Sequence, residues 1–530
     1  MAKLRLTAAL LLTAGLLFPK ISVAQSVAVA APPAAASEKI SPTPDKLTAA
    51  RALFQQGRFK EAVAVLAPAE QINPTADAYA LEVRSLLKLD DVTAAESKSQ
   101  HAVELFPRSA IVLAARGDAL FRRGLMADAE DQYRAALKLN DSCERAWLGM
   151  GRIYSAASRR KDSKDAYTRA HELDPTDGDA YYYWALGLQY PQNVTELEKH
   201  LAGFPDDAER ERHEREYIDF LKALRGRKVW VPVKQPEHAE LKLQAVLSDS
   251  VPRPRSPLSG AQSVLPPADS RLRGFSLQVR LNDKANASVM LDTGASGLTI
   301  SRKLAEKAGA IRLSEHSLEG VGNAGPAKGY EAWLDKVTVG EFEFHDCHVH
   351  VSPQENADYD GLIGTDLFDD FLVTVDFPGR KLHLEPLPKA PEQPPTSAPA
   401  NFTQIYRFAH IMLIPTTVGK SARGLFVLDT GAFTNSISPQ LAQQVTTVRK
   451  SDVYVKGVSG SVANVFSADE ATLHFSRFSQ PNESMATFDV NGLSKDLGTE
   501  VSGFIGFATL RKMQMIINYR DGLVNFDYRQ

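Results

Sequence analysis

Cysteine is almost absent from this chain of 530 residues, which has only Cys143 and Cys347. They fall in segments that we assign to different domains, so we expect two buried thiols and no disulfide framework. His345 and Cys347 are followed closely by His348 and His350. An extended strand would turn the first two and the last two to opposite faces, and a zinc site needs about four converging ligands, so no metal is expected here.

An excess of charge of either sign is also missing. Lys and Arg total 61 and Asp and Glu total 64, which gives a formal net charge of -3 and no indication of a nucleic-acid partner. The chain has no Gly-x-Ser-x-Gly elbow, no His-Glu-x-x-His pair and no phosphate-binding Gly-x-x-x-x-Gly-Lys loop. Several hydrolase and nucleotide-binding classes are therefore not favoured.

Long apolar runs occur only near the N-terminus. A basic start is followed by apolar residues 6–18 and by small residues at 22–24, which is the pattern of a signal peptide over residues 1–24. The apolar run is shorter than the roughly 20 residues that span a bilayer, which disfavours an uncleaved anchor. We expect a periplasmic or secreted protein with no stable membrane span after cleavage, in which residues 25–45 form a flexible linker.

A repeat of 33 or 34 residues runs through the segment 46–225. Helical stretches end at regularly spaced positions, and turn residues and small residues recur with nearly the same period. The three sets are Pro74, Pro107, Asp141 and Pro175; Gly57, Asp91, Gly124 and Ser158; and Ala62, Ala95, Ala129 and Ser163. The segment resembles tetratricopeptide (TPR) repeats, which implies an all-α solenoid that binds a protein partner, although a spacer role stays open.

The remainder of the chain predicts strands. Prolines are frequent in 226–270, which indicates an extended connection. From about residue 271, apolar and polar residues alternate as in half-buried strands. Residues 271–390 and 401–530, joined by a linker at 391–400, form an internal duplication. At an offset of 137 residues, Leu-Asp-Thr-Gly-Ala at 291–295 recurs at 428–432, and at an offset of 142 Gly-Leu-Ile-Gly at 361–364 meets Gly-Phe-Ile-Gly at 503–506.

An apolar strand that enters Asp-Thr-Gly-Ala, followed later by two apolar residues and Gly, resembles the pattern of pepsin-like and retroviral aspartic proteases, and bacterial retropepsin-like proteases most of all. The resemblance implies two tandem all-β acid protease domains after the helical solenoid. It also implies catalytic roles for Asp292 and Asp429. Its supporting residues fall on Thr293, Gly294, Thr430, Gly431, Gly364 and Gly506.

The chemistry explains why two copies are needed. Hydrolysis of an amide requires one group to deprotonate water and another to protonate the carbonyl oxygen, and two carboxylates that share a proton can do both. We therefore expect an endopeptidase with a polypeptide substrate, no cofactor and a dyad within one chain. A homodimer that pairs equivalent copies, and a non-catalytic envelope scaffold that only binds polypeptide, are the alternatives.

Two small-residue segments occupy the position of the substrate flap in this family. The first contains Gly320, Val321 and Gly322, and the second contains Gly457, Val458 and Gly460. We expect them to close over an extended peptide and exclude water, with ordinary hairpin turns as the alternative.

Overall fold

The computed structural model describes residues 46–72, 74–248, 271–318, 320–322, 327–390, 398–451, 453, 455–457 and 459–528. The expected signal peptide and its linker, much of the proline-rich connection, most of the linker at 391–400 and Val458 lie outside these residues. Among the residues described, no helix is long and apolar enough to cross a membrane.

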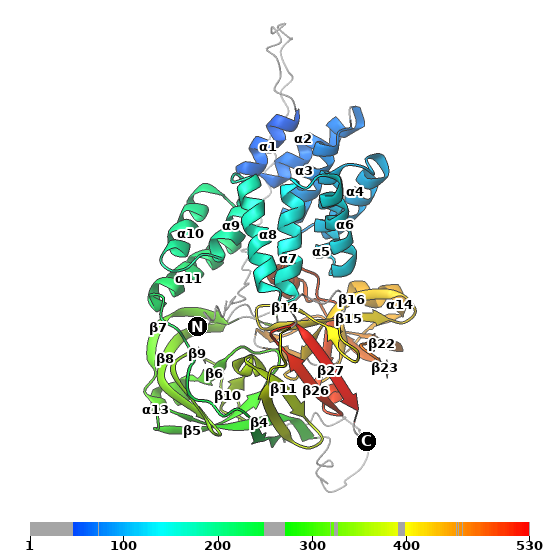
Figure 1. Cartoon of the computed structure of the whole chain (residues 1–530). Helices are drawn as coiled ribbons and strands as arrows, with labels where there is room; N and C mark the ends of the chain where they lie inside the picture. Colours follow the sequence, from blue (N-terminus) through cyan, green and yellow to red (C-terminus); the bar gives the residue numbers. More distant parts are fainter. Residues whose placement is uncertain are drawn as a thin grey trace, which may run out of the picture.

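The N-terminal part is all-helical, as the repeat period predicts, and forms the upper half of the molecule in Figure 1. Successive helices pair as antiparallel neighbours joined by short turns. The helices are α1 (Lys46–Gln55), α2 (Phe59–Ile72), α3 (Ala76–Lys88), α4 (Val92–Leu105), α5 (Ala110–Arg122), α6 (Met126–Leu139), α7 (Glu144–Ala156), α8 (Arg160–Leu173), α9 (Gly178–Leu186), α10 (Gln192–Gly203) and α11 (Ala208–Leu224).

The turns between paired helices need a left-handed residue, which Gly57, Gly124 and Ser158 supply with φ of 72°, 74° and 62°. The sequence spacing predicts Asp91 at the equivalent turn, and this is wrong by one residue. Asp90 takes the left-handed conformation, with φ of 61°, whereas the Asp91 carboxylate caps α4 by accepting from the N–H of Ala94 at 3.1 Å. Asp tolerates either position, so spacing alone did not separate them.

Small residues allow the paired helices to approach closely. Ala62, Ala95 and Ala129 are fully buried, and Ser163 is 4% exposed. A network of ion pairs crosses the first helices of successive pairs. In it, Arg145 on α7 contacts Asp118 on α5 at 2.8 Å and Asp179 on α9 at 3.2 Å. These charges are therefore engaged within the array.

The C-terminal part is β-rich and contains two similar sheets, one for each copy of the duplication. The first sheet comprises β1 (Val231–Lys234), β3 (Gln244–Leu247), β4 (Leu272–Leu281), β5 (Ala285–Leu291), β6 (Leu298–Ser301), β7 (Ile311–Leu318), β8 (Ala327–Val339), β9 (Phe342–Ser352) and β10 (Gly361–Ile363). The second comprises β14 (Tyr406–Phe408), β15 (Ile411–Val418), β16 (Ala422–Asp429), β17 (Ser436–Ile437), β18 (Val448–Lys450), β21 (Phe466–Ala468), β22 (Ala471–Phe475), β23 (Phe478–Asn482), β24 (Met485–Thr487) and β25 (Gly503–Gly506).

A third sheet joins the two copies. Strand β11 of the first copy pairs antiparallel with β26 of the second, with Leu372 opposite Asn518. The sheet contains β2 (Ala239–Lys242), β11 (Phe371–Asp376), β12 (Lys381–Pro386), β13 (Thr403–Gln404), β26 (Met513–Asn518) and β27 (Leu523–Tyr528). One apolar core extends through both copies, so they form a single body within one chain.

Short elements complete the β-rich part. A small hairpin pairs β19 (Lys456–Gly457) with β20 (Gly460–Ser461). The helices are α13 (Arg302–Ala308), the 3-10 helix η1 (Thr365–Phe368), α14 (Pro439–Val445), α15 (Asn491–Leu497) and α16 (Phe507–Leu510). The start of the expected connection is itself structured, because β1, β2 and β3 each add a strand to one of the sheets.

The helical array rests mainly on the second copy (Figure 1). An apolar cluster, which we call the junction cluster, joins residues of α5–α7 to residues of the second sheet, and it includes an edge-on contact between Phe121 and Phe408. Backbone contacts reinforce it, since the N–H of Glu500 donates to the carbonyl of Arg122 at 2.8 Å. Cys143 is buried in this cluster and Cys347 in the main core, and both thiols are free.

Candidate active site

The two aspartates of the duplicated motif lie together at the junction of the two copies. Strand β5 leads into Asp292 and β16 ends at Asp429, and each strand is paired in parallel with the later apolar-Gly strand of its own copy, β10 or β25. The N–H of Asp292 donates to the carbonyl of Ile363 at 2.9 Å. This pairing fixes where each loop leaves its sheet.

Reciprocal hydrogen bonds between two threonines join the two acid loops, residues 292–295 and 429–432. The N–H of Thr293 donates to Oγ1 of Thr430 at 3.0 Å, and the N–H of Thr430 donates to Oγ1 of Thr293 at 3.1 Å. Each hydroxyl then donates to the strand before the other loop, to the carbonyl of Leu428 at 2.8 Å and to that of Leu291 at 3.1 Å. Both threonines are 2% exposed, so these bonds are shielded from water.

Glycine is required beside each carboxylate because the loops approach closely. A Cβ at Gly431 would lie 2.6 Å from Oδ2 of Asp292, and one at Gly294 would lie 2.8 Å from Oδ1 of Asp429. The N–H groups of both glycines point at the carboxylates. That of Gly294 donates to Oδ1 of Asp292 at 2.8 Å, and that of Gly431 donates to Oδ1 of Asp429 at 2.7 Å and to Oδ1 of Asp292 at 3.1 Å.

The two carboxyl groups are hydrogen-bonded to each other and titrate as a pair. Burial, followed by repulsion from Asp429, raises the pKa of Asp292 well above its usual range. Burial also raises the pKa of Asp429, although hydrogen bonds from the N–H groups of Gly431 and Ala432 oppose this. The pair therefore holds one proton more tightly than an isolated carboxyl group does.

Two further glycines lie where a strand passes beneath each loop. A Cβ at Gly364 would lie 2.5 Å from the carbonyl oxygen of Ala295, and one at Gly506 would lie 2.8 Å from that of Ala432. A larger residue at either position would displace the acid loop above it. These distances explain why the same residue stands at the same place in both copies.

Known proteins resemble the two parts of the chain separately. The model of the aspartyl protease family matches residues 277–367, which include the first acid loop and Gly364. The first β domain is aspartyl protease-like. An aspartic proteinase from Irpex lacteus is 11% identical, with a TM-score of 0.34 over 55% of this chain and 98% of that chain. A thermophilic TPR protein from Thermus thermophilus is 20% identical, with a TM-score of 0.27 over 33% of this chain and 97% of that chain. No curated protein matches the chain.

The aspartyl protease-like domain contains supporting residues that the sequence did not identify. Asp366 holds the first acid loop by accepting from the hydroxyl of Ser296 at 2.8 Å and from the N–H of Gly297 at 2.9 Å. In the second copy Asn435 takes a related part, since its Oδ1 accepts from the N–H of Gly506 at 2.9 Å. The self-alignment gave no signal, because the position equivalent to Asp366 is Ala508.

Two aromatic residues of distant segments also lie close to the dyad of the protease-like domains. His410, in the turn after β14, forms a hydrogen bond with the backbone of Gly294, and burial lowers its pKa to about 4. The pKa of Tyr359 is raised by burial and then by the charge of Asp292. No sequence pattern marked either residue, because neither belongs to the repeated motif.

The two expected flap segments of the protease-like domains meet each other. The N–H of Ser459 donates to the carbonyl of Val321 at 3.1 Å, and the N–H of Gly320 donates to the Ser459 hydroxyl at 3.1 Å. Close packing requires glycine here too, since a Cβ at Gly457 would lie 2.2 Å from the carbonyl oxygen of Val321, and Gly322 has a φ of 140°. Gly460 belongs to the β19–β20 hairpin. Val321 packs against the junction cluster.

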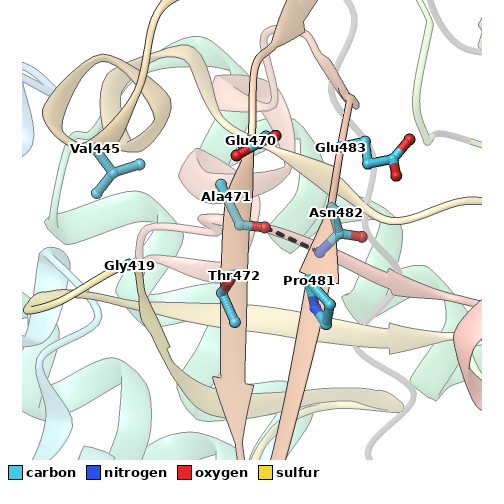
Figure 2. Close-up of a pocket in the computed structure, with 8 residues that line it drawn as sticks. All are labelled: Gly419, Val445, Glu470, Ala471, Thr472, Pro481, Asn482 and Glu483. Carbon is cyan, nitrogen blue, oxygen red and sulfur yellow. Dashed lines mark hydrogen bonds between the residues drawn. The ribbon is translucent and has the colours of Figure 1, made fainter.

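Figure 2 shows a separate hollow of about 460 Å³ at the far end of the second protease-like domain. It is lined by Gly419, Val445, Glu470, Ala471, Thr472, Pro481, Asn482 and Glu483. None of these residues belongs to the acid loops or flap segments. Asn482 links it to the residues below the second acid loop, since its Oδ1 accepts from Nδ2 of Asn435 at 2.9 Å.

Proposed function

We propose that this chain is an exported aspartic endopeptidase whose single active site is the dyad of Asp292 and Asp429. The observation that carries the proposal is the hydrogen-bonded contact, within one chain, of the buried Asp292 and partly buried Asp429 carboxyl groups, both with raised pKa values. Threonine cross-bonds and glycine N–H groups hold both carboxyls in place, which is the preorganisation that such chemistry requires.

In the proposed reaction, the ionised Asp429 accepts a proton from a water molecule, and that water attacks the peptide carbonyl carbon. The protonated Asp292 donates its proton to the carbonyl oxygen, which gives a neutral tetrahedral diol. The carboxyl groups then return protons in the opposite sense: the diol loses a proton, the amide nitrogen gains one, and the C–N bond breaks. No cofactor takes part, and the attacking oxygen comes from water.

The substrate that fits this site is a polypeptide in extended conformation. The flap segments around Val321 and Ser459, which are hydrogen-bonded to each other, would separate to admit the substrate and then close over it. The helical array would bind the client protein, as stacked helix pairs do. The array and Val321 both pack against the junction cluster, so a client bound to the array could lie near the flaps.

The proposed export of the protein is inferred from the sequence of residues 1–24 alone. We propose that this segment directs export and is then removed. Expression of the full chain in a bacterial host, followed by fractionation and N-terminal sequencing, tests this. Recovery of an uncleaved protein in the cytoplasm would contradict it.

Cleavage of a diverse peptide library across roughly pH 3 to 8 tests the activity, with Asp292→Asn and Asp429→Asn as variants and the exposed Asp335→Asn as the matched control. One shared dyad predicts that both site variants lose activity and that the control keeps it. The two site variants should also fail when mixed. Restored activity in the mixture would instead indicate sites formed between chains.

A non-catalytic scaffold would give a different result. The wild-type chain would then cleave no peptide at any pH, and the two site variants would bind polypeptide as well as the wild type does. Fluorescence anisotropy with a labelled unfolded protein as the probe separates this outcome from an active enzyme with a narrow sequence preference. Binding without cleavage by the wild type, repeated over several unrelated unfolded proteins, would overturn the proposal.

A further inference from the structure

A cluster of three metal-binding side chains lies outside the acid dyad, on strands β8 and β9. Glu331 on β8 stands directly opposite His350 on β9, and Trp333 stands opposite His348. Since residues two apart on a strand share a face, His348 and His350 both turn toward Glu331. The carboxylate comes from the neighbouring strand, so the residue pattern of β9 alone did not indicate it.

The ligand atoms of this cluster converge. Nε2 of His348 lies 2.5 Å from Oε2 of Glu331, and Nδ1 of His350 lies 3.0 Å from the same oxygen. One nitrogen or oxygen from each of the three residues falls within 4.8 Å of the other two. Glu331 is 1% exposed, His348 is 6% exposed and His350 is 7% exposed, so the cluster is more than nine-tenths buried.

One nitrogen in the cluster has no ordinary hydrogen bond. Nε2 of His348 is buried and faces Oε2 of Glu331 at 2.5 Å, in an ion-pair contact that lacks ordinary hydrogen-bond geometry. A buried polar atom of this kind is costly unless something satisfies it. A cation between the ligand atoms of Glu331, His348 and His350 would bind all three groups in place of this crowded contact.

From this convergence we infer that Glu331, His348 and His350 form a binding site for a divalent transition-metal ion of the zinc class. Two imidazole nitrogens and one carboxylate oxygen are a usual ligand set for Zn²⁺, at about 2.0–2.2 Å from the metal. Ligands arranged tetrahedrally at that distance lie roughly 3.3 Å apart. Small side-chain rotations that widen the shortest contact would reach this arrangement, and a water molecule would supply the fourth ligand.

The position of the metal site indicates a structural role. The ring of Phe220 on α11 lies over that of His348, with 4.8 Å between centroids, so the helical array covers the cluster. Glu331 lies on the strand that leaves the first flap segment, and His350 is opposite Thr299 on β6, just after the first acid loop. A bound ion would hold these segments together without contacting the dyad.

Cobalt binding tests the inference. The purified full chain is stripped with a chelator and titrated with Co²⁺, whose visible absorption reports four- or five-coordinate nitrogen and oxygen ligands. We expect one ion per chain, displaced by Zn²⁺, with the signal lost in Glu331→Gln and in His348→Gln. The matched control is His345→Gln, because the His345 side chain lies on the same strand but is 45% exposed.

Thermal unfolding provides a second measurement that does not depend on the variants folding well. Zn²⁺ should raise the Tm of the wild type and of His345→Gln by a few degrees, since a ligand that binds only the folded state stabilises it. Absence of Co²⁺ absorption and of a Tm shift in the wild type would overturn the inference and leave a metal-free ion-paired triad. Unchanged binding in folded His348→Gln would place the metal elsewhere and overturn it equally.

Discussion

The two acid loops have the same Asp-Thr-Gly-Ala sequence but differ in the side chains that support them. Both use the threonine cross-bonds and the close glycines. Below the loops the copies diverge, because the ionisable Asp366 holds the first loop directly, whereas the neutral Asn435 holds the strand that passes beneath the second. The duplication therefore preserved the groups that touch both carboxyls and let the more distant supports change.

The copies differ again in what covers them. The helical array packs on the second copy through the junction cluster, whereas the first copy meets mainly α11, through contacts such as Phe220 with His348. The two similar copies therefore have different surroundings in the molecule. Variants made in matched pairs can show which features still act symmetrically.

The largest effect is expected where the copies are most alike. Gly294→Ala and Gly431→Ala would each place a methyl group less than 3 Å from a carboxylate oxygen of the other copy. Because a displacement of about 1 Å at a reacting group can cost about 100-fold, we expect peptidase activity to fall by about that factor in both variants. Initial rates of peptide cleavage measure this.

The control for these variants is Gly492→Ala, since a Cβ at Gly492 meets no atom within 4 Å. It should keep wild-type activity. If only one of Gly294→Ala and Gly431→Ala lost activity, the two loops would not contribute equally to one site.

The threonine cross-bonds should give the next largest effect. Thr293→Ala and Thr430→Ala each remove one hydroxyl that both donates and accepts, and each leaves a buried N–H of the other loop without its partner. An unsatisfied buried donor costs about 1–3 kcal/mol, so the free energy of unfolding should fall by that amount in either variant. Denaturant titration measures it, and the Thr→Ser variants, which keep the hydroxyl, should recover most of the loss.

A smaller and unequal effect is expected for the diverged supports. Asp366→Ala removes the partner of the partly buried N–H of Gly297, and Asn435→Ala removes that of the buried N–H of Gly506, so each should destabilise the fold by about 1–2 kcal/mol. Activity should separate them, because Asp366 holds the acid loop itself and Asn435 holds only the strand below the other. A larger loss of kcat in the Asn435 variant would contradict this order.

Much of this architecture could be predicted from the sequence because both halves repeat. The 33–34-residue period located the helix pairs, and the recurrence of Asp-Thr-Gly-Ala at 292–295 and 429–432 implied two loops that face each other. Repetition also limited the prediction. Asp90 and Asp91 compete for one turn, and only the backbone conformation separates them.

Features built from unrepeated segments could not be predicted. Asp366 has Ala508 as its counterpart, and His410 reaches Gly294 from a turn of the other copy. The convergence of Glu331 with His348 and His350 depends on the register between β8 and β9, which no local pattern specifies. No local pattern specifies the packing of the helices on the second copy either.

The smallest expected effect concerns the contribution of the dyad to the stability of the fold, which can be measured separately from its activity. Burial and the neighbouring carboxylate raise the pKa of Asp292, so the folded chain binds this proton more tightly than the unfolded chain does. The contribution of the dyad to stability is therefore greatest at acidic pH and declines as pH rises through the raised pKa. Asp292→Asn carries no charge at any pH and should escape this decline.

The Asp292→Asn variant should consequently have a Tm a few degrees above that of the wild type at pH 7 and a difference near zero at acidic pH, where the wild-type proton is in place. Differential scanning calorimetry from about pH 4 to 8 measures both limits. Asp335→Asn, on an exposed side chain, should show no such trend. A Tm of Asp292→Asn below that of the wild type at pH 7 would mean that the carboxylate pair stabilises the fold, and the repulsion inferred between Asp292 and Asp429 would then be wrong.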